Sequence, residues 1–173
     1  EPGLEHQAEC PPAPPPETVP TDQARLAPHA ARLPEFLRER LLAERPIEIR
    51  TVGEDDPFGA GPRPPQRMAW FRAQHGLPDA PWVHQALLAY ASDFSFLTTA
   101  LKPHGMTWLT GGLQVASLDH AVWFHRPFVP HDWHRYEVTR LNNTDSRGLV
   151  TGALYDTGGV LIASTSQEAL WRL

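Results

Sequence analysis

The stretch PWVHQALLAYASDFSFLTTAL, residues 81–101, has the longest uninterrupted helical periodicity in the chain. Its apolar residues recur at steps of three and four, which predicts one long helix. The residues of this apolar face are Val83, Leu87, Tyr90, Phe94, Leu97 and Leu101. Pro81 suits a first turn, Asp79 is the expected N-cap, and Pro103 with Gly105 should end the helix. Since polar residues are sparse on every side, we expect this helix to be buried all round.

Asp93 lies in the middle of this stretch. Small residues, Ala86, Ala89 and Ala100, lie along the same side of the predicted helix and would let other backbone approach the carboxylate. A buried carboxylate without partners is costly. We therefore expect Asp93 to have polar partners elsewhere in the chain.

Length and charge limit the classes of protein that this sequence fits. The 173 residues are enough for one domain with a real core, and no apolar run is long enough to predict a transmembrane helix. The net charge of -5, without a basic cluster, argues against nucleic acid as a partner. Cys10 is the only cysteine, so no disulfide framework is expected, as is typical of a reducing compartment. The chain has no signal peptide pattern and no initiator Met, which is consistent with a start partway into a longer protein.

The N-terminal part differs in composition from the rest. Residues 1–20 include PPAPPPETVP and predict an extended arm without regular secondary structure. Residues 21–43 predict one or two short surface helices, interrupted by Pro28 and Pro34. We therefore divide the chain into an arm with short helices, residues 1–43, and a folded domain, residues 44–173.

The remaining segments have the pattern of β-strands. ERPIEIRTV and RMAWFRA predict two strands before the helix. After it come four β-rich runs, residues 113–125, 133–141, 147–156 and 160–173, separated by the turn-forming segments RPFVPHD, NNTDS and TGG. Four consecutive strands predict an antiparallel meander. One long helix with a large antiparallel sheet predicts the α+β class, with the sheet curled around the helix.

Several motifs along the chain carry a resemblance to a known family. They are PGLEHQ, RPIEIR, YASDFSFL, LKPHG, SLDHAVWFHRPF, SRGLVTGALYDTGGVLIAS and SQEALWR. Together they resemble the C-terminal half of a type II acyl-CoA thioesterase, a bacterial and peroxisomal family with the hotdog fold. The resemblance implies a protein of two hotdog units, of which this chain matches the second and the linker into it. It implies a second hotdog half as partner, in the same or another chain, and a homo- or hetero-oligomer.

The resemblance also implies which residues act. The family uses an Asp, a Thr or Ser, and a Gln to hold the water that attacks the thioester. These residues match Asp93, Ser117 and Gln167, with Ser117 standing where other members carry Thr. No metal and no organic cofactor is implied, and the expected reaction converts acyl-CoA to free fatty acid and coenzyme A. The family places this reaction in fatty acid and lipid metabolism, in the bacterial cytoplasm or alternatively in the peroxisome.

Other polar residues are weaker candidates. His120, Arg126 and Arg147 are candidate substrate-binding residues, although a histidine packed in the sheet is the alternative for His120. Asp119 shares a strand face with Ser117 and is expected to form structural hydrogen bonds. His131 and His134 lie close together, but two histidines without a third ligand do not predict a metal site.

Two other functions remain open from the sequence. One is a non-catalytic hotdog half that binds acyl groups or serves assembly with a partner hotdog. The other, less favoured, is a hotdog enoyl-CoA hydratase. A hydratase would place an Asp and a His a few residues apart at the start of the helix, whereas here Asp93 is in mid-helix and His104 follows the end of the helix.

Overall fold

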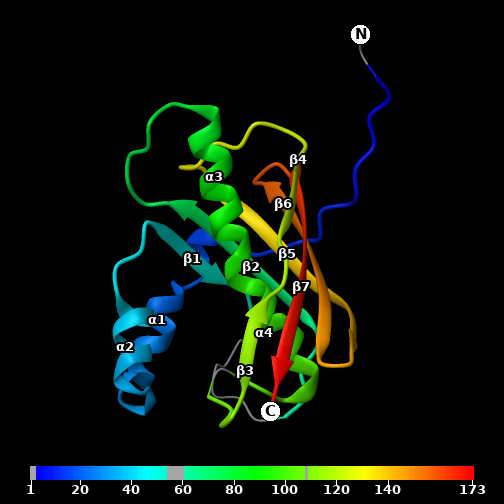
Figure 1. Cartoon of the computed structure of the whole chain (residues 1–173). Helices are drawn as coiled ribbons and strands as arrows, with labels where there is room; N and C mark the ends of the chain where they lie inside the picture. Colours follow the sequence, from blue (N-terminus) through cyan, green and yellow to red (C-terminus); the bar gives the residue numbers. More distant parts are fainter. Residues whose placement is uncertain (1–2, 54–60, 108) are drawn as a thin grey trace.

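A curled antiparallel sheet dominates the structure, a computed structural model that describes residues 3–53, 61–107 and 109–173. In this described part, seven strands form one sheet in the order β1-β2-β5-β6-β7-β3, and β4 also pairs with β7. The strands are β1 (Ile47–Thr51), β2 (Gln66–Ala73), β3 (Gln114–Ser117), β4 (Ala121–Phe124), β5 (His134–Thr144), β6 (Arg147–Asp156) and β7 (Leu161–Arg172). Figure 1 shows the sheet wrapped around the helix that begins at Pro81, as the α+β prediction requires.

The strand pairing differs from the predicted meander. β5, β6 and β7 do follow one another as neighbours, but β3 and β4 pair with β7 instead of β5. β5 therefore pairs with β2, and β2 with β1. The prediction failed here because the segment between β4 and β5, residues 125–133, is longer than a tight hairpin turn, so it does not force these two strands to pair.

The predicted run 113–125 is split into two short strands on the same neighbour. Ser117 at the end of β3 lies opposite Ala169, and Ala121 at the start of β4 lies opposite Ser166. Three residues, 118–120, thus face the two residues 167 and 168 of β7. One extra residue on one strand is a β-bulge, which redirects side chains and is frequent beside functional sites.

The predicted long helix is interrupted. It consists of α3 (Pro81–Ser92), the 3-10 turn η3 (Asp93–Ser95), α4 (Phe96–Leu101) and the 3-10 turn η4 (Lys102–His104). The Ser92 hydroxyl donates to the Ala89 carbonyl at 3.0 Å, and such back-bonding bends helices. Ala80, not the expected Asp79, is the N-cap, and no side chain caps this end. The end of the segment is as predicted, with Gly105 in the left-handed conformation at φ 65.

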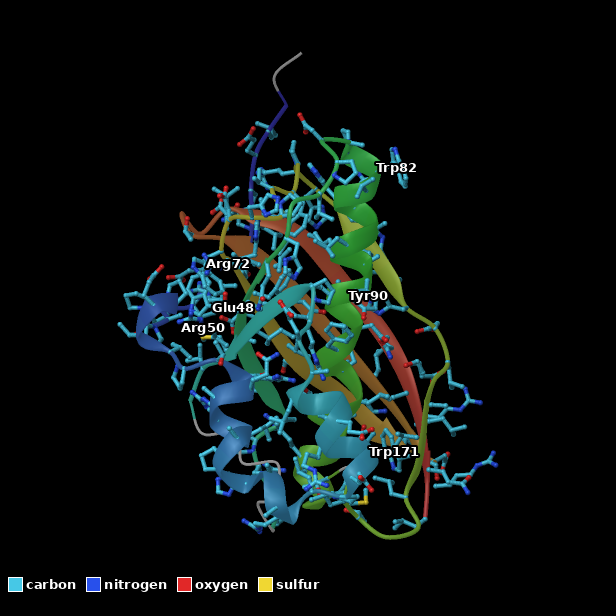
Figure 2. The ribbon with its side chains drawn as sticks, turned by 90° about the vertical axis from the view of Figure 1, so that its left-hand side faces the viewer. Glu48, Arg50, Arg72, Trp82, Tyr90 and Trp171 are labelled. Carbon is cyan, nitrogen blue, oxygen red and sulfur yellow. The ribbon has the colours of Figure 1, made fainter. Side chains whose placement is uncertain are left out.

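Only one side of α3 is buried, which corrects the expectation of burial all round for this helix, whereas every residue of α4 is buried or half-buried. Leu88 and Phe96 are fully buried against the sheet, whereas Trp82 is 73% and Tyr90 55% exposed. Figure 2 shows Trp82 projecting from α3 into solvent. The reason is geometric, since the single sheet covers only the side of the helix that it curls around.

The core lies between the sheet and these helices. The larger core residues are Ile47, Phe71, Leu88, Phe96, Tyr136, Val150 and Leu154. Along β6, buried residues alternate with more exposed ones, as in a strand with one covered face. No helix in the described residues is long and apolar enough to span a bilayer.

The N-terminal arm crosses the other face of the sheet. The indole of Trp70 donates to the Pro14 carbonyl at 3.0 Å, and Arg50 donates to the carbonyls of Pro16 and Val19, both at 2.9 Å. The arm is extended as predicted, except for the 3-10 turn η1 (Pro16–Thr18). Three short helices follow, α1 (Asp22–Leu26), η2 (Ala27–Arg32) and α2 (Glu35–Leu42), and Pro34 is the N-cap of α2.

A charged cluster anchors the face under the arm. The buried Glu48 carboxylate pairs with Arg50 at 2.5 Å and with Arg72 at 3.0 Å (Figure 2). Both guanidinium groups also lie over the Trp133 ring, at 5.0 and 4.3 Å from its centre. Burial acts to raise the pKa of Glu48, but the hydrogen bonds and charges of the two arginines outweigh it and hold this pKa below its ordinary value.

Candidate active site

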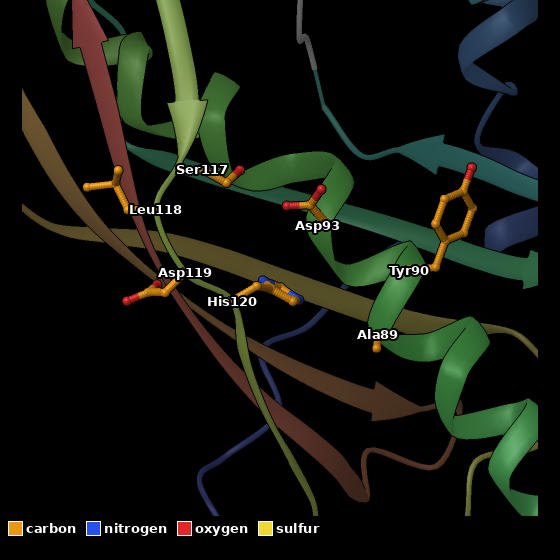
Figure 3. A pocket seen from close by; sticks show the side chains of 7 residues that line it. All are labelled: Ala89, Tyr90, Asp93, Ser117, Leu118, Asp119 and His120. Atoms are coloured by element: carbon orange, nitrogen blue, oxygen red, sulfur yellow. The ribbon is translucent and has the colours of Figure 1, made fainter.

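An open pocket of about 350 Å³ lies between the C-terminal end of α3 and the bulge that separates β3 from β4. The helical side contributes Ala89, Tyr90 and Asp93, and the strand side contributes residues 117–120. Figure 3 shows Asp93 and Ser117 pointing toward one another across the pocket, with His120 turned toward the helix. Two sequence-distant segments are thus brought together, and three predicted site residues, Asp93, Ser117 and His120, line this pocket.

Asp93 begins the η3 turn and is exposed to solvent. Figure 3 shows its carboxylate pointing toward Ser117. The expectation of a deeply buried carboxylate is therefore wrong, because Asp93 lies on the side of the helix that the sheet does not cover. Exposure removes the desolvation cost that seemed to demand protein partners for this charge.

Ser117 ends β3 and is exposed, and Gln167 lies behind it on β7 with no exposed surface. The Gln167 amide nitrogen donates to the Ser117 hydroxyl oxygen at 2.5 Å. Gln167 does not line the pocket. It therefore acts on the pocket's contents through Ser117 and His120, the two lining residues that it contacts.

His120 joins these residues to the helix. One ring nitrogen, Nδ1, is 2.8 Å from Oε1 of Gln167, and the other, Nε2, is 2.8 Å from the hydroxyl of Ser92. The ring also packs edge-on against Phe96, with 5.4 Å between ring centres. Ser92 is 1% exposed and was not singled out from the sequence; its signal was its place next to Asp93, on the buried side of the helix.

The bulge that carries Ser117 and His120 is held by hydrogen bonds to Glu168 of β7. The Leu118 N–H donates to the Glu168 carbonyl at 2.9 Å, and the Glu168 N–H donates to Oδ1 of Asp119 at 2.7 Å. Asp119 thus has the structural hydrogen bond expected of it. These bonds fix the strand side of the pocket without using the Ser117 or His120 side chains.

A buried tyrosine supports the helical side. The Tyr136 hydroxyl donates to the Ser92 carbonyl at 3.2 Å and lies 2.7 Å from the hydroxyl of Thr165. Burial raises the pKa of Tyr136 far above its usual range, so the phenol stays neutral. This neutral donor holds the end of α3 next to Asp93.

The other candidates lie outside the pocket. Arg126 donates to the Leu161 carbonyl at 2.7 Å, and Arg147 pairs with Glu168 at 3.1 Å. The pocket itself is lined by no Lys or Arg within the described residues. Burial lowers the pKa of His134. The described part of the chain has no group of three or more His, Cys, Asp or Glu side chains that could hold a metal ion.

The pocket therefore combines two functional groups that water chemistry can use. The carboxylate of Asp93 can accept a proton, and the hydroxyl of Ser117 can donate or accept a hydrogen bond. Behind them, His120 and Gln167 are fixed by hydrogen bonds at both ends. This arrangement suits an attacking water, since both open groups face the same space.

Comparisons with known proteins identify relatives of this chain. The chain is 40% identical over 170 residues to acyl-CoA thioesterase 2 of Haemophilus influenzae, covering 98% of this chain and 59% of that protein. It is 35% identical over 178 residues to human acyl-coenzyme A thioesterase 8, covering 98% of this chain and 55% of that protein. The chain thus spans somewhat more than half the length of these relatives.

Solved structures show the same fold. An acyl-CoA thioesterase II from Mycobacterium marinum superposes with a TM-score of 0.69 at 31% identity, covering 99% of this chain and 59% of that one. A hot dog fold protein from Alicyclobacillus acidocaldarius superposes at 0.67 with 17% identity, covering 100% and 58%. The expected hotdog fold is thereby confirmed. The family model for acyl-CoA thioesterase matches residues 36–170, so the chain belongs to the acyl-CoA thioesterase family.

Proposed function

We propose that this chain carries the site of an acyl-CoA thioesterase, at which Asp93 activates a water for attack on the thioester. The observation that carries the proposal is the pocket in which the Asp93 carboxylate and the Ser117 hydroxyl face each other. The family membership and the names of the relatives support the substrate class.

In the proposed reaction, the water donates one proton toward Asp93 and one toward Ser117, which leaves a lone pair for the carbonyl carbon. As the water oxygen bonds to this carbon, its proton passes to the carboxylate. The tetrahedral intermediate then collapses and the C–S bond breaks, and Asp93 returns its proton to the leaving sulfur, which gives the thiol of coenzyme A and restores the carboxylate. Thioesters are activated acyl groups, so a positioned water and one base suffice without a covalent nucleophile.

Gln167 has a different role in this proposal from that of the two open residues. It is fully buried and contacts Ser117, so it acts by orienting that hydroxyl and does not touch the water itself. The structural reason for its burial is its position on β7, directly under the bulge. Gln167 is therefore a positioning residue.

We infer further that a second hotdog unit covers the pocket. Asp93 and Ser117 are exposed, and exposed apolar residues surround them and continue along α3 and β4: Trp82, Tyr90, Leu118, Trp123 and Phe124. Large exposed apolar patches mark interaction surfaces. A partner there would also exclude bulk water from the reacting groups, which strengthens electrostatic effects on the reaction.

The direct test is Asp93→Asn, which keeps the shape of the side chain and removes the basic oxygen. We expect turnover of an acyl-CoA, followed as released thiol, to fall by about a hundredfold to ten-thousandfold, with KM changed much less. Ser117→Ala and Gln167→Ala should each cost less, and either one combined with Asp93→Asn should cost less than the product of the single losses.

Asp79→Asn is the matched control, since Asp79 is exposed and does not cap the helix. We expect both Asn variants to unfold within about 0.5 kcal/mol of the wild type, because both positions are on the surface. Near-normal turnover by Asp93→Asn would refute the role of Asp93. Binding of acyl-CoA without thiol release by the wild-type chain and its assembly would instead favour the non-catalytic binding half.

A further inference from the structure

Four side chains form a continuous hydrogen-bonded row from the helix to the pocket, Ser92–His120–Gln167–Ser117, here called the relay. Its three links measure 2.8, 2.8 and 2.5 Å. Ser92 and Gln167, at 1% and 0% exposure, have no access to water, so their hydrogen bonds must be satisfied within the relay and its neighbours. The positions of the protons along the row are therefore coupled.

The bonds as they stand suit a charged His120. The Ala89 carbonyl can only accept, so the Ser92 proton is directed to it, at 3.0 Å. Ser92 must then accept a proton from Nε2 of His120, while Oε1 of Gln167 must accept one from Nδ1. Both ring nitrogens carry protons in this arrangement, which makes the ring an imidazolium. The Gln167 amide nitrogen donates to Ser117, which leaves this hydroxyl one proton and one lone pair to present to the pocket.

A neutral His120 ring with its proton on Nε2 can also satisfy the hydrogen bonds of the relay. Nε2 still donates to Ser92, but Nδ1 must now accept. A half-turn of the Gln167 amide meets this need, because it exchanges the places of the amide nitrogen and oxygen. The amide oxygen then faces Ser117 and accepts its proton, so Ser117 presents only lone pairs to the pocket.

We propose that His120 is a positioning residue whose protonation state sets, through Gln167, whether the Ser117 hydroxyl offers the pocket only lone pairs or a proton as well. The consequence for hydrolysis rests on the function proposed above. A water that attacks through its lone pair is held best when it donates its protons to Asp93 and Ser117, so it needs Ser117 as an acceptor. The neutral ring leaves Ser117 only this role, whereas the imidazolium leaves Ser117 a proton that competes for the lone pair that must attack.

The charged surroundings of His120 come from both sides of the pocket. Asp93 on the helical side and Asp119 on the bulge are the carboxylates that line it. From the sheet, Tyr136 approaches through Phe96 and Ser92, and it is neutral. Histidine is the side chain that most often exchanges a proton near neutral pH, so a change of pH is the perturbation that tests the switch.

The test compares His120→Asn with wild type in the assembly that hydrolyses acyl-CoA. Asn keeps an amide that can donate to or accept from Gln167, but it cannot take up a proton near neutral pH. For wild type we expect kcat to fall as the pH is lowered from about 8 to about 5.5, because protonation of the ring removes the arrangement that favours hydrolysis. His120→Asn should have a lower kcat at pH 8 and should lose most of this pH dependence. His125→Asn is the control, since His125 is exposed and contacts Ser164 outside the pocket, and it should keep the wild-type profile.

A second readout does not depend on turnover. Nitrogen NMR of the His120 ring should show the proton on Nε2 above pH 8, and the Gln167 amide signals should shift with the same midpoint as the ring. A neutral ring protonated on Nδ1, or an unchanged pH profile in His120→Asn, would overturn the proposal. If the assembly hydrolyses no acyl-CoA but the His120 ring and the Gln167 amide titrate together, the proposed function is refuted. The proposed coupling between His120 and Gln167 is supported in that case.

Discussion

Gly152→Ala is a sharp test of how the sheet supports the site. Gly152 lies on β6 and is buried under Tyr136. A Cβ placed there would lie 2.5 Å from Oγ1 of Thr165 and 2.6 Å from both Cε2 and the hydroxyl oxygen of Tyr136. These distances are too short for any contact, so the Tyr136 ring and Thr165 have to move apart.

The cost follows from what that movement breaks. Overpacking of this kind costs about 1–3 kcal/mol, and leaving the Tyr136 and Thr165 hydroxyls without their mutual hydrogen bond adds about 1–3 kcal/mol. Alanine lowers the conformational entropy of the unfolded chain relative to glycine, which offsets about 0.4–1 kcal/mol of this loss of stability. We therefore expect the free energy of unfolding to fall by about 1–6 kcal/mol.

Urea unfolding followed by fluorescence measures this change, with Gly76→Ala as the control. Gly76 is exposed and a Cβ there meets nothing within 4 Å, so the control should change stability by no more than about 0.5 kcal/mol. Turnover should also fall in folded Gly152→Ala, since Tyr136 holds the end of α3 beside Asp93. A loss of stability equal to that of Gly76→Ala would refute this account of the packing.

Two further predictions concern the outer surfaces. Trp82→Ser should weaken association of the chain in sedimentation at micromolar concentration, because it removes an aromatic side chain that is 73% exposed. Val160→Ser is the control and should not weaken association. A wild-type chain that stays monomeric would contradict the inference that a second hotdog unit covers the pocket. Glu48 has a lowered pKa in the folded state, so its contribution to stability is present above its ordinary value of 4.5 and is lost as the pH falls through the folded value. Glu48→Gln should therefore unfold more easily at pH 7 and lose less stability on acidification than Glu17→Gln, measured by thermal unfolding at each pH.

The three candidate catalytic residues differ in solvent exposure, which the sequence does not show. Asp93 and Ser117 are open to the pocket, whereas Gln167 has no exposed surface. The sequence motifs do not distinguish the three residues by exposure. The structure separates Asp93 and Ser117, which can touch a substrate, from Gln167, which can act only through its neighbours Ser117 and His120, and it adds the buried Ser92 to this hydrogen-bonded row.

The sequence by itself determined the features that depend on local pattern. Helical periodicity located the helical segment and its end at Gly105, period-two alternation located the strands, and the motifs indicated the hotdog fold and Asp93, Ser117 and Gln167 as candidates. Each of these follows from residues close together in the chain, where spacing decides which side chains share a face.

The tertiary structure decided what depends on contacts between distant segments. Local periodicity does not specify which strand edge β3 joins, and its pairing with β7 creates the bulge that points Ser117 and His120 toward the helix. Nor does it specify which side of an apolar helix the sheet covers, so Asp93 was expected in the core and lies in solvent. Both outcomes depend on which distant surfaces pair and bury each other, and no property of either segment alone determines that choice.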